Sequence, residues 1–142
     1  MVAVVILALG LLGLAGMQAK SLSNDLSAYN RSQATQLAYD IADRMRSNVT
    51  VLANYITPSP STCPNNTNPC TACTTAVLTC TPAQLAQKDL FEWNRNITAT
   101  LGNGATGTIS NPGGAFFTVT VSWDDDKDPV TGDLNFAMSF GP

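Results

Sequence analysis

Apolar side chains fill almost every position of residues 1–19, and none of these residues is charged. A helix of about 20 such residues is long enough to cross the hydrocarbon core of a bilayer. We therefore predict a transmembrane helix over this segment. A cleavable secretory signal is the weaker alternative, because no basic region precedes the apolar run and Met17 stands where the cleavage site needs a small residue.

The pattern becomes amphipathic over residues 20–56. Neither proline nor glycine occurs between Gly16 and Pro58, so nothing in the sequence interrupts a helix that begins near the start of the chain. We therefore predict one long helix over residues 1–56. Its apolar residues recur mostly every three or four positions, at Leu22, Leu26, Tyr29, Leu37, Ile41, Met45, Leu52 and Ile56.

The polar face of the same helix carries two acid–base pairs. Asp40 and Arg44 are four residues apart, and Asp43 and Arg46 are three apart, with the acid first in each case. Such pairs are usually exposed and contribute only tenths of a kcal/mol, roughly. We interpret this face as an ordinary solvated surface.

A second helix is predicted over residues 82–101. Thr81, Pro82 and Gln84 form the capping-box pattern of a helix start, with threonine at the N-cap and proline in the first turn. Apolar residues then follow at helical spacing, and Gly102 ends the run.

Residues 105–140 change to a period of two, which predicts antiparallel strands. The clearest alternation covers residues 117–123 and 134–140, and a weaker strand around 106–110 reaches the first of these through a turn at 111–114. The apolar face of this sheet is the expected cover for Leu37, Ile41 and Met45.

The predicted fold class is therefore α+β: a long N-terminal helix packed on a small antiparallel sheet of three to four strands. The helix has a transmembrane half (1–19) and an amphipathic half (20–56). The globular head, residues 57–142, contains a cysteine loop (57–81), a short second helix (82–101) and the strands (105–140).

The loop over residues 57–81 is rich in Pro, Ser, Thr and Asn, so its order requires a crosslink. All four cysteines, Cys63, Cys70, Cys73 and Cys80, lie in it. Two disulfides fit a segment that faces an oxidising compartment. Three pairings are possible, and we favour one that links the two halves of the loop. A zinc site is the weaker alternative, because the spacing lacks the paired knuckles of known zinc modules.

Composition argues against catalysis and nucleic-acid binding. The chain has no histidine, and its seven Lys and Arg are scattered within a net charge of −3. We expect no enzyme activity, catalytic residue, cofactor, nucleic acid or small-molecule substrate. The acidic loop near residues 124–133 resembles the start of an EF-hand, but Pro129 and Asn135 stand at its diagnostic positions. We therefore favour a solvated loop without metal, and calcium in another geometry is the alternative.

Two blocks of the long helix, residues 2–22 and 32–48, resemble the N-terminal helix of type IV pilins. The run QLAYDIADRMR (residues 36–46) is specifically similar to minor pilins of the PilV type. This resemblance implies a structural protein that helps initiate assembly of a type IV pilus and lies at or near its tip. Its partners would be other pilins, contacted through the apolar helix, and its head would face the periplasm while the helix is held in the inner membrane.

The family pattern also includes a basic leader, a cleavage site, a methylated phenylalanine and an early glutamate. We expect Met1 to fall just inside the mature segment, downstream of these features. Two other functions fit the same architecture: a type II secretion pseudopilin, and a membrane-anchored periplasmic module that binds a ligand or metal.

Overall fold

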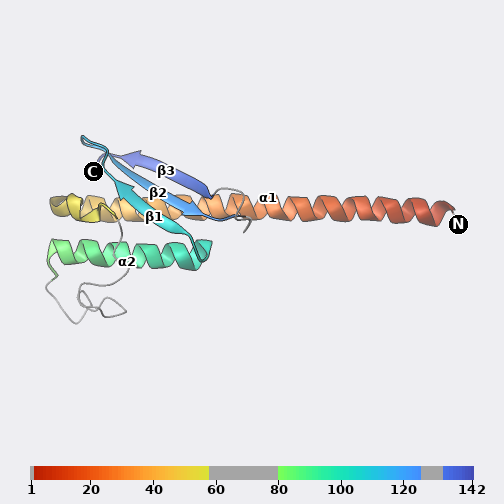
Figure 1. Ribbon diagram of the computed structural model, residues 1–142, viewed down its shortest axis with the longest axis horizontal. Coiled ribbons are helices and arrows are strands. Elements are labelled where there is room, and N and C mark those ends of the chain that lie inside the picture. Colours follow the sequence, from red (N-terminus) through yellow and green to blue (C-terminus); the bar gives the residue numbers. More distant parts are fainter. Residues whose placement is uncertain (1, 58–79, 126–132) are drawn as a thin grey trace. The chain divides into compact units, whose positions relative to one another are not determined.

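The computed structural model describes residues 2–57, 80–125 and 133–142. The chain divides into two compact units, residues 1–32 and 33–142, and each unit is considered by itself. The order of elements is helix α1, a short 3₁₀ segment η1, helix α2 and strands β1 to β3 (Figure 1).

The described part of the first unit is entirely helical and belongs to α1 (Val2–Ser47). Its large apolar side chains are exposed over the full length of the unit; Val4 is 71% and Leu12 69% exposed. Among the described residues, no helix is long and apolar enough to cross a membrane. The transmembrane span expected over residues 1–19 thus stays a prediction.

Helix α1 ends at Ser47, and the prediction that it continues to residue 56 is wrong. Asn48 leaves the helical conformation (φ −128°, ψ 45°), and η1 (Val49–Tyr55) follows, interrupted at Val51. Two causes act together. The β-branched residues 49–51 favour an α-helix weakly, and the Asn48 side chain donates to the Pro82 carbonyl at 2.9 Å, which ties the chain to another element.

The head contains α2 (Pro82–Leu101) and a three-stranded antiparallel sheet in the order β1-β2-β3. The strands are β1 (Thr106–Ser110), β2 (Phe117–Trp123) and β3 (Leu134–Phe140). The predicted capping box is confirmed, because the Thr81 hydroxyl accepts from the Gln84 amide and the Gln84 side chain accepts from the Thr81 amide. Gly102 ends α2 at a positive φ of 102°.

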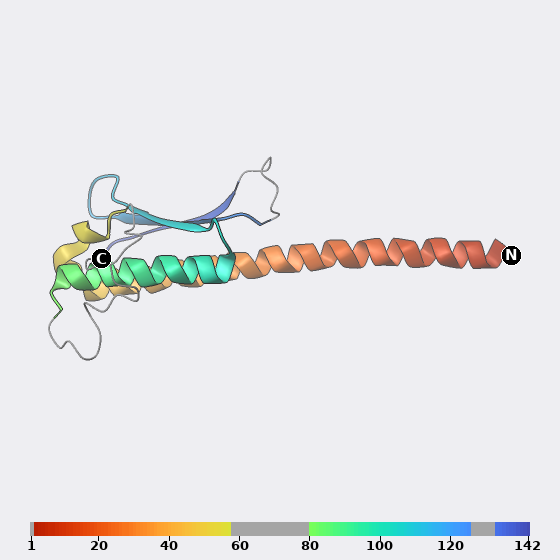
Figure 2. The ribbon, with the colours of Figure 1, turned by 60° about the horizontal axis from the view of Figure 1, so that its bottom comes forward.

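Residues 33–47 of α1, which belong to the second unit, and helix α2 lie side by side against one face of the sheet (Figures 1 and 2). Alternate residues of β2 are buried and the intervening ones half-exposed, as the period of two predicts. Ile41 and Met45 are fully buried, and Leu37 packs against the same core, so the predicted contact of this stripe with the sheet is confirmed. The α+β fold is therefore the one that the sequence predicts.

Candidate functional site

Two features outside the ordinary core carry the functional argument. The first is the apolar surface, defined here as the exposed large apolar side chains of the first unit from Val2 to Met17. Full burial of one valine, leucine or methionine stabilises a protein by about 1.5–3 kcal/mol relative to exposure. A surface built from so many of these residues favours contact with apolar partners.

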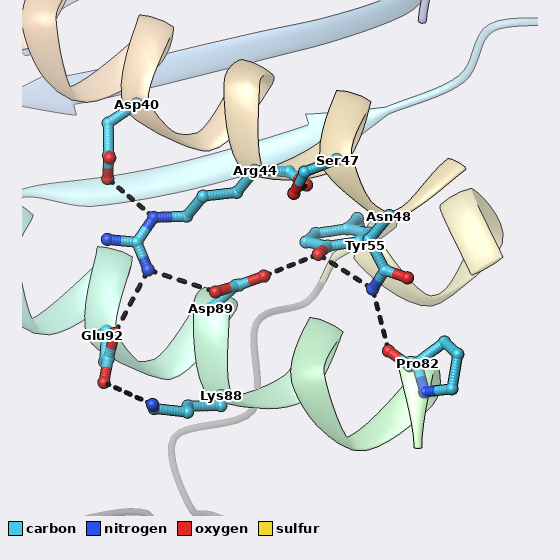
Figure 3. Close-up of polar contacts among 9 residues, drawn as sticks. All are labelled: Asp40, Arg44, Ser47, Asn48, Tyr55, Pro82, Lys88, Asp89 and Glu92. Atoms are coloured by element: carbon cyan, nitrogen blue, oxygen red, sulfur yellow. Dashed lines mark hydrogen bonds and ion pairs between the residues drawn. The ribbon is translucent and has the colours of Figure 1, made fainter. Parts of the chain in front are cut away.

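The second feature is a polar network that joins α1, η1 and α2 (Figure 3). At its centre lies Arg44, whose guanidinium Nε contacts Asp40 at 3.1 Å. Its Nη1 atom contacts Asp89 and Glu92 of α2, each at 3.1 Å. Burial lowers the pKa of Arg44, but the hydrogen bonds to Asp40, Glu92 and Asp89 raise that pKa by more, so it lies above its ordinary value.

The prediction that Arg44 belongs to an ordinary solvated face is therefore wrong. Its side chain is 29% exposed, and Asp89 on the neighbouring helix is 10% exposed. By contrast, the Asp43–Arg46 pair lies on the surface, as predicted, at 2.9 Å. The spacing of charges along α1 is similar for the two pairs, so only the approach of α2 distinguishes them.

The network continues from Asp89 into the buried end of η1. The Tyr55 hydroxyl donates to Asp89 at 2.7 Å, and the Asn48 side-chain amide lies 3.3 Å from the same hydroxyl. Burial raises the pKa of Tyr55 above its ordinary value, and the hydrogen bond to Asp89 raises it further. Each buried side-chain nitrogen or oxygen in the described part of the chain has a hydrogen-bond partner. The network therefore fixes η1 on α2 without an unsatisfied polar group.

A close contact between α2 and β1 complements the polar network. The Trp93 ring nitrogen donates to the Leu37 carbonyl at 2.8 Å, which places the ring between α1 and the sheet. A Cβ atom on Gly107 of β1 would lie 2.6 Å from Trp93 Cζ3 and 2.6 Å from Ile97 Cδ1. Glycine at this position is thus required by the close approach of the helix to the strand.

The predicted disulfide residues lie mostly outside the described residues. Cys80 is half-buried just before α2 and is disulfide-bonded, whereas Cys63, Cys70 and Cys73 fall within 58–79. The pairing therefore stays a prediction. Most of the acidic loop also falls outside the described residues; of its described part, Asp125 accepts from the Trp123 ring nitrogen at 3.4 Å. The zinc and calcium alternatives are likewise untested.

The polar network is the part that sequence reasoning missed. Only the Asp40–Arg44 spacing is visible in the sequence, and it does not distinguish a surface pair from an interhelical one. Asn48, Tyr55 and Asp89 carry no periodic signal that would assign them to one cluster. Their contacts depend on the chain reversal between α1 and α2.

Comparison with known proteins identifies the architecture. A family model described as Tt1218-like, type IV pilin Tt1218, matches residues 16–91, which is more than half of the chain. The chain belongs to this type IV pilin family. No curated protein and no solved structure matches it. The matched residues of this pilin include the start of α2 and the whole polar network except Glu92.

Membership in the family gives this pilin a structural role in a pilus on the cell surface, in association with other pilus subunits. A structural role also agrees with the expectation that the chain is not an enzyme. The type IV pilin resemblance is thereby confirmed, while the PilV-type assignment stays a prediction.

Proposed function

We propose that this chain is a minor pilin of the PilV type that helps initiate assembly of a type IV pilus and lies at or near the pilus tip. The observation that carries the proposal is the apolar surface on the first unit of the chain. It contributes nothing to the hydrophobic core of the head, whose residues all lie in the second unit. Such a surface is stable only when lipid or other apolar helices cover it.

Before assembly, on this proposal, the apolar surface lies in the inner membrane and the head lies in the periplasm. During assembly, the same side chains pack against the helices of other pilins. Small residues permit close approach of helices, and Gly10 and Gly13 have open space around their Cα atoms in the isolated chain. The sequence resemblance to PilV-type pilins supports the minor role.

The first experiment separates packing of the apolar surface from folding of the head. Leu12→Glu places a charge in the apolar surface, and we expect the variant to be lost from sheared, purified pili. Gln36→Glu is the matched control, because it adds the same charge to an exposed position of α1 that belongs to the head unit. Equal incorporation of both variants would contradict the packing argument.

The minor and initiating roles need a second experiment. Deletion of the gene should reduce the number of pili per cell, and immunogold labelling should find the protein at filament ends in a small ratio to the major subunit. Labelling along whole filaments would instead indicate a major pilin. Co-purification with type II secretion components would favour a pseudopilin. Normal piliation on deletion, combined with calorimetric binding of calcium or zinc, would favour a ligand-binding module.

A further inference from the structure

The outer edge of β3 is a surface of the head to which the proposed pilin function assigns no role. Strand β3 is the last strand of the sheet, and within the described residues no hydrogen bond from another element reaches its outer edge (Figure 1). The opposite edge is occupied, because the Thr57 amide donates to the Ile109 carbonyl at 3.0 Å and its hydroxyl accepts from the Ile109 amide at 2.9 Å.

The contact at Thr57 fixes which β3 groups face outward. Ile109 turns its amide and carbonyl away from β2, so it forms a non-hydrogen-bonded pair with Val119. Val119 therefore exchanges hydrogen bonds with its β3 partner, Met138. Because the direction alternates along a strand, the outward amides and carbonyls of β3 belong to Asn135, Ala137 and Ser139.

The edge lacks the usual features that prevent strand pairing. Residues 134–140 contain no charge and no proline, and they form a regular strand of seven residues. Natural edge strands are normally protected by lysine, proline, a bulge or a covering element. Three of the four apolar side chains of β3 that face the helices, Leu134, Phe136 and Met138, stay half-exposed, whereas Phe140 and the equivalent side chains of β2 are buried. Addition of another strand would complete their burial.

We propose that the β3 edge is a self-association surface, at which two copies of this chain pair antiparallel about a two-fold axis through Ala137. The sequence LNFAMSF is self-complementary in this register: Ala137 meets its own copy, Asn135 meets Ser139, and Phe136 meets Met138. Apolar residues then face apolar residues, small and polar ones face each other, and no like charges meet. Each outward-facing residue exchanges both backbone hydrogen bonds with its partner.

The symmetry determines which copies can meet. A two-fold axis normal to the sheet reverses every direction within the sheet plane, and residues 33–47 of α1 run along the sheet (Figure 2). These segments therefore run in opposite directions in the two copies. Subunits of one polar filament all point the same way, so this pairing joins heads from two opposing pili rather than neighbours in one filament.

The test uses the full chain in detergent micelles, with association measured by sedimentation equilibrium. Ala137→Lys places two ammonium groups opposite each other at the axis, and we expect the dissociation constant to rise about threefold to tenfold. Thr120→Lys is the matched control: Thr120 pairs with Ala137 on the same face, but on the central strand, away from the edge. It should leave the dissociation constant within about twofold.

Charge complementation makes the test specific to the proposed axis. Ala137→Asp should also weaken pairing, whereas an equimolar mixture of the Lys and Asp variants should form mixed dimers at least as tightly as the unmodified chain. Hydrogen exchange of residues 134–140 should slow as the concentration of the unmodified chain rises. The proposal is overturned if exchange is independent of concentration, if the two Lys variants associate equally, or if mixing restores nothing. Protection of β3 only within assembled pili would show that another subunit occupies the edge.

Discussion

Replacement of Asp89 by asparagine tests the polar network with the smallest change of shape. The side chain of Asp89 is 10% exposed and accepts hydrogen bonds from both the Tyr55 hydroxyl and the Arg44 guanidinium, at 2.7 and 3.1 Å. Asparagine offers one oxygen, which can keep the hydrogen bond from the Arg44 guanidinium; its NH₂ group then faces the Tyr55 hydroxyl, whose own proton no longer has an acceptor there. At least one hydrogen bond to a charged group is lost, which contributes about 1.5–3 kcal/mol.

The structure also sets an upper limit on this effect. Arg44 keeps Asp40 and Glu92 after the substitution, so its charge is not left unpaired. The larger cost of an isolated buried charge, about 3–5 kcal/mol, should therefore not appear. We expect Asp89→Asn to lower the free energy of unfolding by about 2–3 kcal/mol.

Urea unfolding of the chain in detergent micelles, followed by fluorescence of the buried tryptophans, measures this loss. Asp43→Asn is the control, because its side chain is 71% exposed and pairs with Arg46, so its effect should stay below about 0.5 kcal/mol. A double-mutant cycle with Tyr55→Phe should give a coupling energy of about 1 kcal/mol or more. The network argument fails if Asp89→Asn destabilises the chain no more than Asp43→Asn.

Three further predictions concern the core and its response to pH. Gly107→Ala should lower the free energy of unfolding by about 1–3 kcal/mol through overpacking, whereas Gly141→Ala, whose Cβ would make only ordinary contacts, should change it little in the same urea assay. Ile41→Asp should abolish cooperative thermal unfolding, because it buries an unpaired charge, and Tyr39→Asp at an exposed position should not; an unchanged melting temperature for Ile41→Asp would refute the placement. Burial and hydrogen bonding raise the pKa of Tyr55 above its ordinary value of 10.0, so the folded state holds this proton more tightly than the unfolded state. The stability that Tyr55 supplies is therefore complete below about pH 10 and falls above it by up to about 1.4 kcal/mol per pH unit. Unfolding measured from pH 8 to 11 should show a smaller fall for Tyr55→Phe, whereas Tyr39→Phe should behave as the unmodified chain.

The elements of this fold were largely predictable because their signals are local. The Thr81 capping box and the helical spacing up to Gly102 give α2 to the residue. The alternation of Phe117 to Trp123 and of Leu134 to Phe140 gives β2 and β3 in the same way. These predictions agree with the structure because the spacing of apolar residues reflects which side of a helix or strand is buried.

The candidate site was predictable only in part. The apolar surface follows from composition alone, since no residue of 1–19 is charged. The end of α1 was misplaced, because Asn48 is drawn out of the helix partly by a hydrogen bond to Pro82, a residue distant in sequence. No local pattern records such a contact.

The sequence by itself determined the second helix, the strands and most of the long helix, because periodicity and capping act between neighbouring residues. Tertiary structure decided the role of each polar residue. Arg44 and Arg46 carry the same charge on the same helix, but α2 half-buries the first beside Asp89 and leaves the second at the surface. The same holds for β3, whose open edge follows from the strand order and not from its own sequence. The contacts and the solvent exposure of a group depend on how the whole chain packs. They decide whether a charged side chain stabilises the fold, and whether a strand edge is available for association.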